Sequence, residues 1–404
     1  MRLEQEKLDI WLFKLLFLMA GGIVVTQTLG LESLTSYMFL LTFPVTGLLW
    51  ARSVRKTLTV WDLLILLAVG MAVINVLINT VVTDTRPSFN YFKKMIMFVM
   101  TLVYLQACSR MQIHDKVVKF FNRLLELLIV YLILAFFILN IQMFMIGGRV
   151  SAYLTFRFNN PNLTGLFLTC LYMLEFPRLF GKDKWHKKLY RIVLLVALAG
   201  FVVLTSSRNS LLVMLLFTAG CIVLMLLPRV SLRMDAVATI IVIMVPVVFM
   251  AIYMTVVYNE SVQNLFGFLV EEGKSLDSRI EIWEPALNDL RGSPIIGAYS
   301  QITGGTGAAQ MHNTHLDIAC SYGIPVLLVV CVLLFRWLNQ RNQAYKDKAG
   351  FAYMLGFAST IIMGMGEAAL FSGSLGLYIL VGFFLLMANR GAKEDQPVEL
   401  EEWD

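Results

Sequence analysis

Charged residues are scarce in this chain, and loop cysteines are absent. Only 15% of its 404 residues are charged and 58% are hydrophobic, whereas about a quarter of a soluble globular domain is charged. None of the five cysteines lies in a loop where a bridge would be useful, so we predict no structural disulfide. The first apolar segment lacks a small-residue cleavage site and is expected to remain as a helix. Composition therefore excludes a soluble enzyme and a disulfide-framework domain.

The sequence consists instead of repeated apolar runs of about 20 residues, long enough to cross a hydrocarbon core of ~30 Å. These runs predict an all-α polytopic membrane protein with about twelve transmembrane helices. We expect spans near residues 9–29, 33–50, 59–80, 90–108, 122–146, 162–178, 190–205, 210–227, 236–257, 313–334, 350–370 and 373–389. The expected parts are spans one to nine at 1–257, a large extracytoplasmic loop with an amphipathic helix at 258–312, spans ten to twelve at 313–389, and an acidic cytoplasmic tail at 390–404.

Lysine and arginine are distributed unevenly between the two sets of loops. One set, near residues 52–56, 110–123, 182–191, 229–233, 336–348 and 390–393, is richer in these cations, by roughly threefold, and the positive-inside rule makes it cytoplasmic. Both termini are then expected inside, in a bacterial cytoplasmic (inner) membrane. The net charge of +6 comes largely from these loops. It indicates topology and contact with membrane lipids, and we predict no nucleic-acid partner.

The few cations on the predicted outer side are almost all arginines close to span ends, among them Arg149, Arg157 and Arg208. A guanidinium can bind phosphate oxygens in a bidentate manner, so the set favours an anionic ligand on this side. For any single arginine, the alternative is snorkelling to lipid headgroups.

The large loop contains one readable helix. Ser278 and Glu281 have the spacing of a capping box, and apolar residues including Trp283 and Leu290 recur at helical spacing. Such a helix is expected on the membrane surface or over a cavity, with Trp283 as an interface anchor. Arg279, near its start, gains nothing from the helix macrodipole, which favours a role other than helix stability.

His312 and His315 lie one turn apart at the beginning of the tenth predicted span. Three interpretations compete. They could be polar residues that start a helix, or two ligands of a metal site that lacks a third. The third interpretation is a general base at the membrane edge, because imidazole titrates near neutral pH.

Several short motifs occur in order along the second half of the chain. They are SSRNS around Arg208, Ser278-Arg279 with Trp283, SPIIG at 293–297, His312-Asn313, and Gly323, with FNNPN at 158–162 as a weaker element. In order and spacing this pattern resembles the O-antigen ligase/polymerase superfamily. One departure is Pro325, near which the family often has a second glycine.

The resemblance implies a GT-C-like glycosyltransferase whose donor is a glycan on undecaprenyl pyrophosphate and whose acceptor is a sugar hydroxyl or lipid-linked sugar. It implies that Arg208 and Arg279 bind the pyrophosphate, and that His312 deprotonates the acceptor, with inversion. We expect Arg157, Asn162, Tyr299, His315 and Glu367 to contact substrate, and Asn313 to bind the pyrophosphate or to orient His312. For Glu367, an intramembrane carboxylate, the alternative is a packing partner for an arginine.

No metal and no cofactor are expected, because arginines can neutralise the leaving group and the chain has no Asp-x-Asp motif. Within the family, the loop of moderate length favours a polymerase of surface polysaccharide (O-antigen or capsule) over a ligase acting on lipid A-core. A flippase and a chain-length regulator are the expected partners. A rival of another class is a secondary transporter, which predicts internal repeats, broken helices and paired intramembrane charges. No repeat relates the two halves of the sequence.

Overall fold

The computed structural model describes residues 2–55, 57–82, 89–146, 156, 158, 160–226, 234–258, 277–298, 311–339, 347–367, 370–371 and 376–390. Every regular element in these ranges is helical, which confirms the all-α prediction. In chain order they are α1 (Arg2–Leu29), α2 (Glu32–Val54), α3 (Val60–Val82), α4 (Phe89–Arg110), α5 (Asp115–Ile146), α6 (Pro161–Glu175), η1 (Phe176–Phe180), α7 (Trp185–Leu204), α8 (Arg208–Leu226), α9 (Ala236–Tyr258), α11 (Asp277–Gly292), α13 (Thr314–Tyr322), α14 (Ile324–Leu338), α15 (Lys348–Met363) and α16 (Leu377–Arg390).

Helix length and composition indicate a membrane protein. Seven candidate spans among the described helices are long and apolar enough to cross a membrane: they lie on α1, α2, α3, α5, α6 with η1, α8 and α9. The helices α14, α15 and α16 are apolar but shorter. Large apolar side chains such as Trp11, Val196 and Leu226 are exposed on outward faces. Such surface is favourable against lipid and unfavourable in water. The chain is therefore a polytopic helical protein, and the number twelve stays a prediction.

The tenth predicted span, 313–334, is not one helix. α13 ends at Tyr322, α14 begins at Ile324, and Gly323 between them has φ of +90°. Glycine adopts this backbone conformation without a Cβ clash. Hydropathy alone does not show the break, because the apolar composition continues across it.

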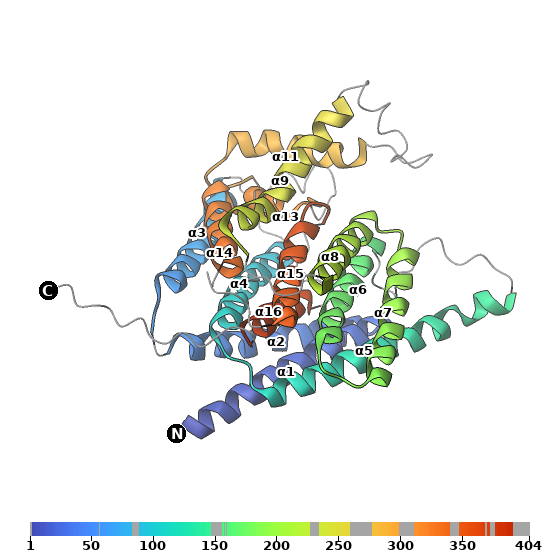
Figure 1. Ribbon diagram of the computed structural model, residues 1–404. Helices are drawn as coiled ribbons and strands as arrows, with labels where there is room; N and C mark the ends of the chain where they lie inside the picture. The colour runs from blue at the N-terminus through green and yellow to red at the C-terminus, as the bar shows by residue number, and fades with distance from the viewer. Residues whose placement is uncertain are drawn as a thin grey trace.

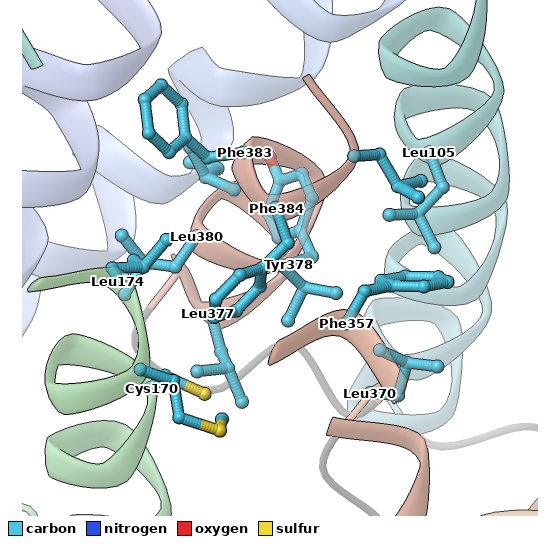
Figure 2. Close-up of a cluster of buried hydrophobic side chains, with 14 of the residues drawn as sticks. Leu105, Cys170, Leu174, Phe357, Leu370, Leu377, Tyr378, Leu380, Phe383 and Phe384 are labelled. Atoms are coloured by element: carbon cyan, nitrogen blue, oxygen red, sulfur yellow. The ribbon is translucent and has the colours of Figure 1, made fainter. Parts of the chain in front are cut away.

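The core is organised around α16, which is buried from Leu377 to Ala388. Figure 2 shows its side chains, Phe383 and Phe384 among them, between residues of α4, α6 and α15. Glycine permits this close approach of helices. A Cβ atom on Gly382 would lie 2.2 Å from the Tyr104 ring.

The two ends of the bundle differ in the arrangement of their charged residues. α11 lies across one end, beside α13 (Figure 1); we call this the α11 end. At the opposite end, Arg178 of η1 pairs with Glu175 of α6 at 2.5 Å and also with Glu126 of α5. Arg191 of α7 pairs with Asp183 at 2.5 Å. These ion pairs join α5, α6, η1 and α7 where loops meet the apolar core.

Replacing Arg178 by methionine should destabilise this end strongly. The Glu175 side chain is fully buried, and removing the partner of a buried charge costs about 3–5 kcal/mol. Arg191 Nε remains 3.6 Å from Glu175, so the expected loss lies toward the lower end of that range. The measurement is thermal unfolding of the purified protein in detergent. Arg123→Met is the matched control, since Arg123 is exposed on α5. Equal stability of the two variants would show that the cluster contributes nothing.

Candidate active site

Asn313 positions the start of α13. Its Oδ1 accepts hydrogen bonds from the backbone N–H groups of His315 and Leu316, both at 3.1 Å. Its Nδ2 donates to the carbonyl of Pro246 in α9 at 2.8 Å. The residue is fully buried, so its amide caps α13 and ties it to α9. The sequence placed Asn313 among the substrate-binding residues, and here both ends of its amide bind the protein itself.

His312 stands just before that cap and pairs with Glu367. Its Nδ1 lies 3.1 Å from Oε2 of Glu367. The imidazole is 27% exposed and the carboxylate 6%. The Glu367 backbone carbonyl accepts a hydrogen bond from Thr314 Oγ1 at 3.2 Å. Glu367 was expected to contact substrate or to pack against an arginine, and in the structure its carboxylate lies against His312.

The backbone at His312 is also unusual. Its φ is +49°, a left-handed conformation that costs a non-glycine residue roughly 1–3 kcal/mol and persists only when the surroundings impose it. The surroundings here are the Asn313 cap on one side and the end of α15 on the other. Such outliers cluster at functional sites.

The end of α15, which leads into this carboxylate, is held from both sides. The Thr314 N–H donates to the Gly364 carbonyl at 2.8 Å. Asn209 of α8 donates through Nδ2 to the Met363 carbonyl at 2.8 Å. A Cβ atom on Gly366 would lie 2.8 Å from the Asn209 amide, so glycine is needed for this approach. The starts of α8 and α13 therefore cap the end of α15.

Arg208 is the first residue of α8, immediately before Asn209, and its side chain is exposed. The preceding corner packs against α6: a Cβ atom on Gly165 would lie 2.7 Å from Ser207. Asn162, partly exposed, stands three residues before Gly165 at the start of α6. The structure thus brings the helix starts that carry Arg208 and Asn162 to the region that holds the histidine–carboxylate pair.

The α11 helix is anchored by Trp283, which is fully buried. Its Nε1 donates a hydrogen bond to the carbonyl of Met311 at 2.6 Å, and Met311 immediately precedes His312 in the sequence. Its ring packs edge-on against Tyr253 of α9, with 5.4 Å between ring centroids. The prediction of a membrane-interface anchor was wrong, because the apolar face of α11 packs on protein. Arg279 is partly exposed one turn earlier on the same face.

The SPIIG segment at 293–297 packs over the break between α13 and α14. The Ile324 N–H donates to the Pro294 carbonyl at 2.8 Å. A Cβ atom on Gly323 would lie 1.9 Å from the Ile295 carbonyl oxygen. This motif and the glycine after α13 therefore form one backbone contact.

Two asparagines of α3 complete the contact. Asn75 donates through Nδ2 to the carbonyls of Ile295, at 3.2 Å, and Tyr322. Asn79 donates to the Ile296 carbonyl at 3.0 Å. The Tyr322 carbonyl at the helix break and two carbonyls of the SPIIG segment are thereby satisfied.

The remaining expected residues divide into two groups. His315 is buried in α13, and neither ring nitrogen has a hydrogen-bond partner in the described part of the chain. Arg157 and Tyr299 lie outside the described residues. Within the described ranges, no three His, Cys, Asp or Glu side chains are grouped so as to hold a metal ion.

The His312–Glu367 pair has the arrangement of a general base held by a carboxylate. A carboxylate that accepts a hydrogen bond from Nδ1 fixes the ring and leaves Nε2 as the proton-accepting nitrogen. It also stabilises the imidazolium that forms. Arg208 begins a helix, where the macrodipole adds to its attraction for an anion. The α11 end therefore combines a histidine–carboxylate pair with cations suited to phosphate.

Sequence reasoning missed Asn75, Asn79, Asn209 and Thr314. The two asparagines of α3 had a signal, since amides four residues apart in an apolar helix share one face. Asn209 and Thr314 had none, because ordinary helix-start residues do not reveal a distant partner.

Gly323→Ala should lower the free energy of unfolding by about 1–3 kcal/mol or more, because alanine is strained at φ of +90° and its Cβ would meet a carbonyl. The check is the unfolding midpoint in detergent. Gly292→Ala, at the end of α11, is the control, since among the described residues nothing beyond the adjoining backbone lies within 4 Å of a Cβ there. A Gly323→Ala protein as stable as wild type would contradict this account of the break.

Residues 193–331 match the family model described as O-antigen ligase. The matched stretch begins in α7, ends in α14 and includes Arg208, Arg279 and His312, whereas Glu367 lies beyond it. No curated protein and no solved structure matches the chain. The resemblance carried by the sequence motifs is thereby confirmed, and over residues 193–331 this chain carries an O-antigen ligase family domain.

Proposed function

We propose that this protein is a membrane glycosyltransferase that moves a glycan from undecaprenyl pyrophosphate to a sugar hydroxyl. The family match at residues 193–331 supports O-antigen ligase/polymerase-type transfer in general. The observation that carries the specific proposal is the His312–Glu367 pair, with Nδ1 and Oε2 3.1 Å apart, at the start of α13. A histidine held in this way suits proton abstraction from a hydroxyl.

In the proposed reaction His312 acts as the base. Nε2 takes the proton of the acceptor hydroxyl while the hydroxyl oxygen forms a bond to the anomeric carbon of the donor glycan. The bond from that carbon to the phosphate oxygen breaks, and the electron pair leaves with undecaprenyl pyrophosphate. Attack opposite the leaving group inverts the anomeric configuration. Glu367 keeps the ring in place and stabilises the imidazolium.

Arg208 and Arg279 are assigned to the pyrophosphate. Charge develops on the leaving oxygens as the bond breaks, and fixed cations there lower the barrier. Support comes from the exposure of Arg208 at the start of α8 and the partial exposure of Arg279 on α11. Arg157, Asn162, Tyr299 and His315 are proposed as further substrate contacts. The reaction as written requires no metal or other cofactor.

We place the site on the outer face of a bacterial cytoplasmic membrane, with both termini inside, as the loop charges indicate. Polymerisation of surface polysaccharide repeat units is the preferred reaction, because the 258–312 loop is of moderate length. Transfer to lipid A-core by a ligase is the alternative, which the description of the matched family favours. A flippase and a chain-length regulator remain the proposed partners.

Two structural features are compatible with the alternative function, secondary transport. The break at Gly323 and a buried Lys94–Asp317 pair at 2.6 Å are features of transporter helices. The family match favours the transferase. Vesicles that carry solute but transfer no glycan to any acceptor would favour the transporter.

His312→Ala and Arg279→Ala should each lower glycan transfer about a hundredfold or more, the usual loss for a general base or a charge-stabilising group. The assay uses purified protein in detergent with a lipid-pyrophosphate-linked glycan, and wild-type turnover should survive EDTA. Arg291→Ala is the control, because Arg291 is exposed in the last turn of the same helix as Arg279. Near-normal turnover of both variants would refute the site assignment, and the acceptor that supports turnover separates polymerase from ligase.

Glu367→Gln should lower kcat about 10²–10⁴-fold with little change in KM, because a neutral amide does not stabilise the imidazolium and its NH2 group can donate to Nδ1 and select the wrong tautomer. Steady-state kinetics with the same donor measure both constants. Glu281→Gln, an exposed carboxylate on α11, serves as control. If Glu367→Gln raises KM and leaves kcat unchanged, Glu367 binds substrate and does not support the base.

A further inference from the structure

Lys94 and Asp317 form a largely buried ion pair beside the candidate site. Lys94 lies near the start of α4, and its Nζ is 2.6 Å from Oδ1 of Asp317 in α13. The lysine side chain is 13% exposed and the aspartate 5%. Buried lysine and aspartate are rare unless paired, and neither residue belongs to the chemistry proposed above.

A second contact between α4 and α13 lies near the ion pair. Phe98, one turn after Lys94 on α4, stacks on Tyr322 at 4.5 Å between ring centroids. α13 is nine residues long, and Gly323 separates it from α14. Its position therefore depends on side contacts, and α4 supplies one near each end of it.

We infer that the Lys94–Asp317 ion pair is a positioning device that holds α13, and with it His312, against α4. The Coulomb attraction is strong because little solvent screens it, and it is anchored in a helix that carries no proposed catalytic group. Asp317 also sits in the first turns of α13, where its charge complements the helix macrodipole. The helix macrodipole accounts for an acidic residue at position 317, but it does not account for Lys94 on the neighbouring helix α4. The catalytic part of this inference rests on the proposed function.

The test compares Lys94→Met with the reversed pair Lys94→Asp/Asp317→Lys in full-length protein in detergent. Hydrogen–deuterium exchange of the amides at 314–322 reports the seating of α13 directly, and kcat and KM for glycan transfer report the site. Arg110→Met is the matched control, because it breaks the Arg110–Asp62 pair at the other end of the same helix. Its aspartate is fully buried and its arginine 18% exposed.

Lys94→Met should raise exchange at 314–322 about tenfold, which corresponds to a loss of about 1.4 kcal/mol of local stability. It should lower kcat by a similar factor while KM stays nearly constant, and the reversed pair should restore most of both. Arg110→Met should lower the unfolding temperature without changing α13 exchange or kcat.

Unchanged exchange at 314–322 in Lys94→Met overturns the inference. The inference is also overturned if Lys94→Asp/Asp317→Lys restores hydrogen–deuterium exchange at 314–322 but not kcat, since the Lys94 ammonium would then act on substrate. An Arg110→Met protein that loses kcat and α13 protection equally overturns it as well, because the effect would be one of general stability. If wild type transfers no glycan, the proposed function fails by itself, and the exchange measurement still decides whether the pair seats α13.

Discussion

The site depends on the placement of one short helix. α13 has nine residues, and all of them are buried. A helix of this length has little stability of its own in isolation, so its neighbours determine where it lies. Asn313 ties it to α9 and Thr314 ties it to the end of α15. Trp283 brings α11 to the residue before His312. The candidate base is therefore positioned by elements that are far apart in sequence.

Several residues of the family-like motifs support backbone geometry, and the proposed reaction uses only some of the others. Gly323 and the SPIIG segment make room for a carbonyl that would otherwise meet a Cβ atom at 1.9 Å. Gly366 does the same for Asn209 at the end of α15. The polar groups that the proposed reaction uses are His312, with its carboxylate Glu367, and the arginines. A motif of this kind thus combines a structural requirement with a reactive one, and only the contacts separate the two.

Sequence reasoning succeeded where the physical signal is local. Apolar runs predicted an all-helical chain. The intramembrane position of Glu367 singled it out, since burying a charge is costly, and the structure places its carboxylate against His312. It failed where one pattern fits two environments. An apolar face on α11 packs equally well on lipid or on protein, so Trp283 was misplaced. The apolar run through Gly323 is the same whether the helix continues or breaks, although Pro325 two residues later was a readable signal. The hydrogen bond of Asn209 and the ion pair of Lys94 join residues far apart in sequence, so no local sequence pattern predicts them.

The arginines show how burial separates structural cations from candidate functional ones. At the end opposite α11, Arg178 and Arg191 are each 9% exposed and pair with carboxylates. Their charges are neutralised inside the protein, which accounts for their presence without any ligand. At the α11 end, Arg208 is exposed and Arg279 partly exposed, so both guanidinium groups remain accessible from outside the bundle. Because the apolar interior is the same solvent-poor medium at both ends, the difference lies in accessibility. Exposed guanidinium groups at the end of the bundle that also holds the His312–Glu367 pair suit the anionic substrate of the proposed reaction.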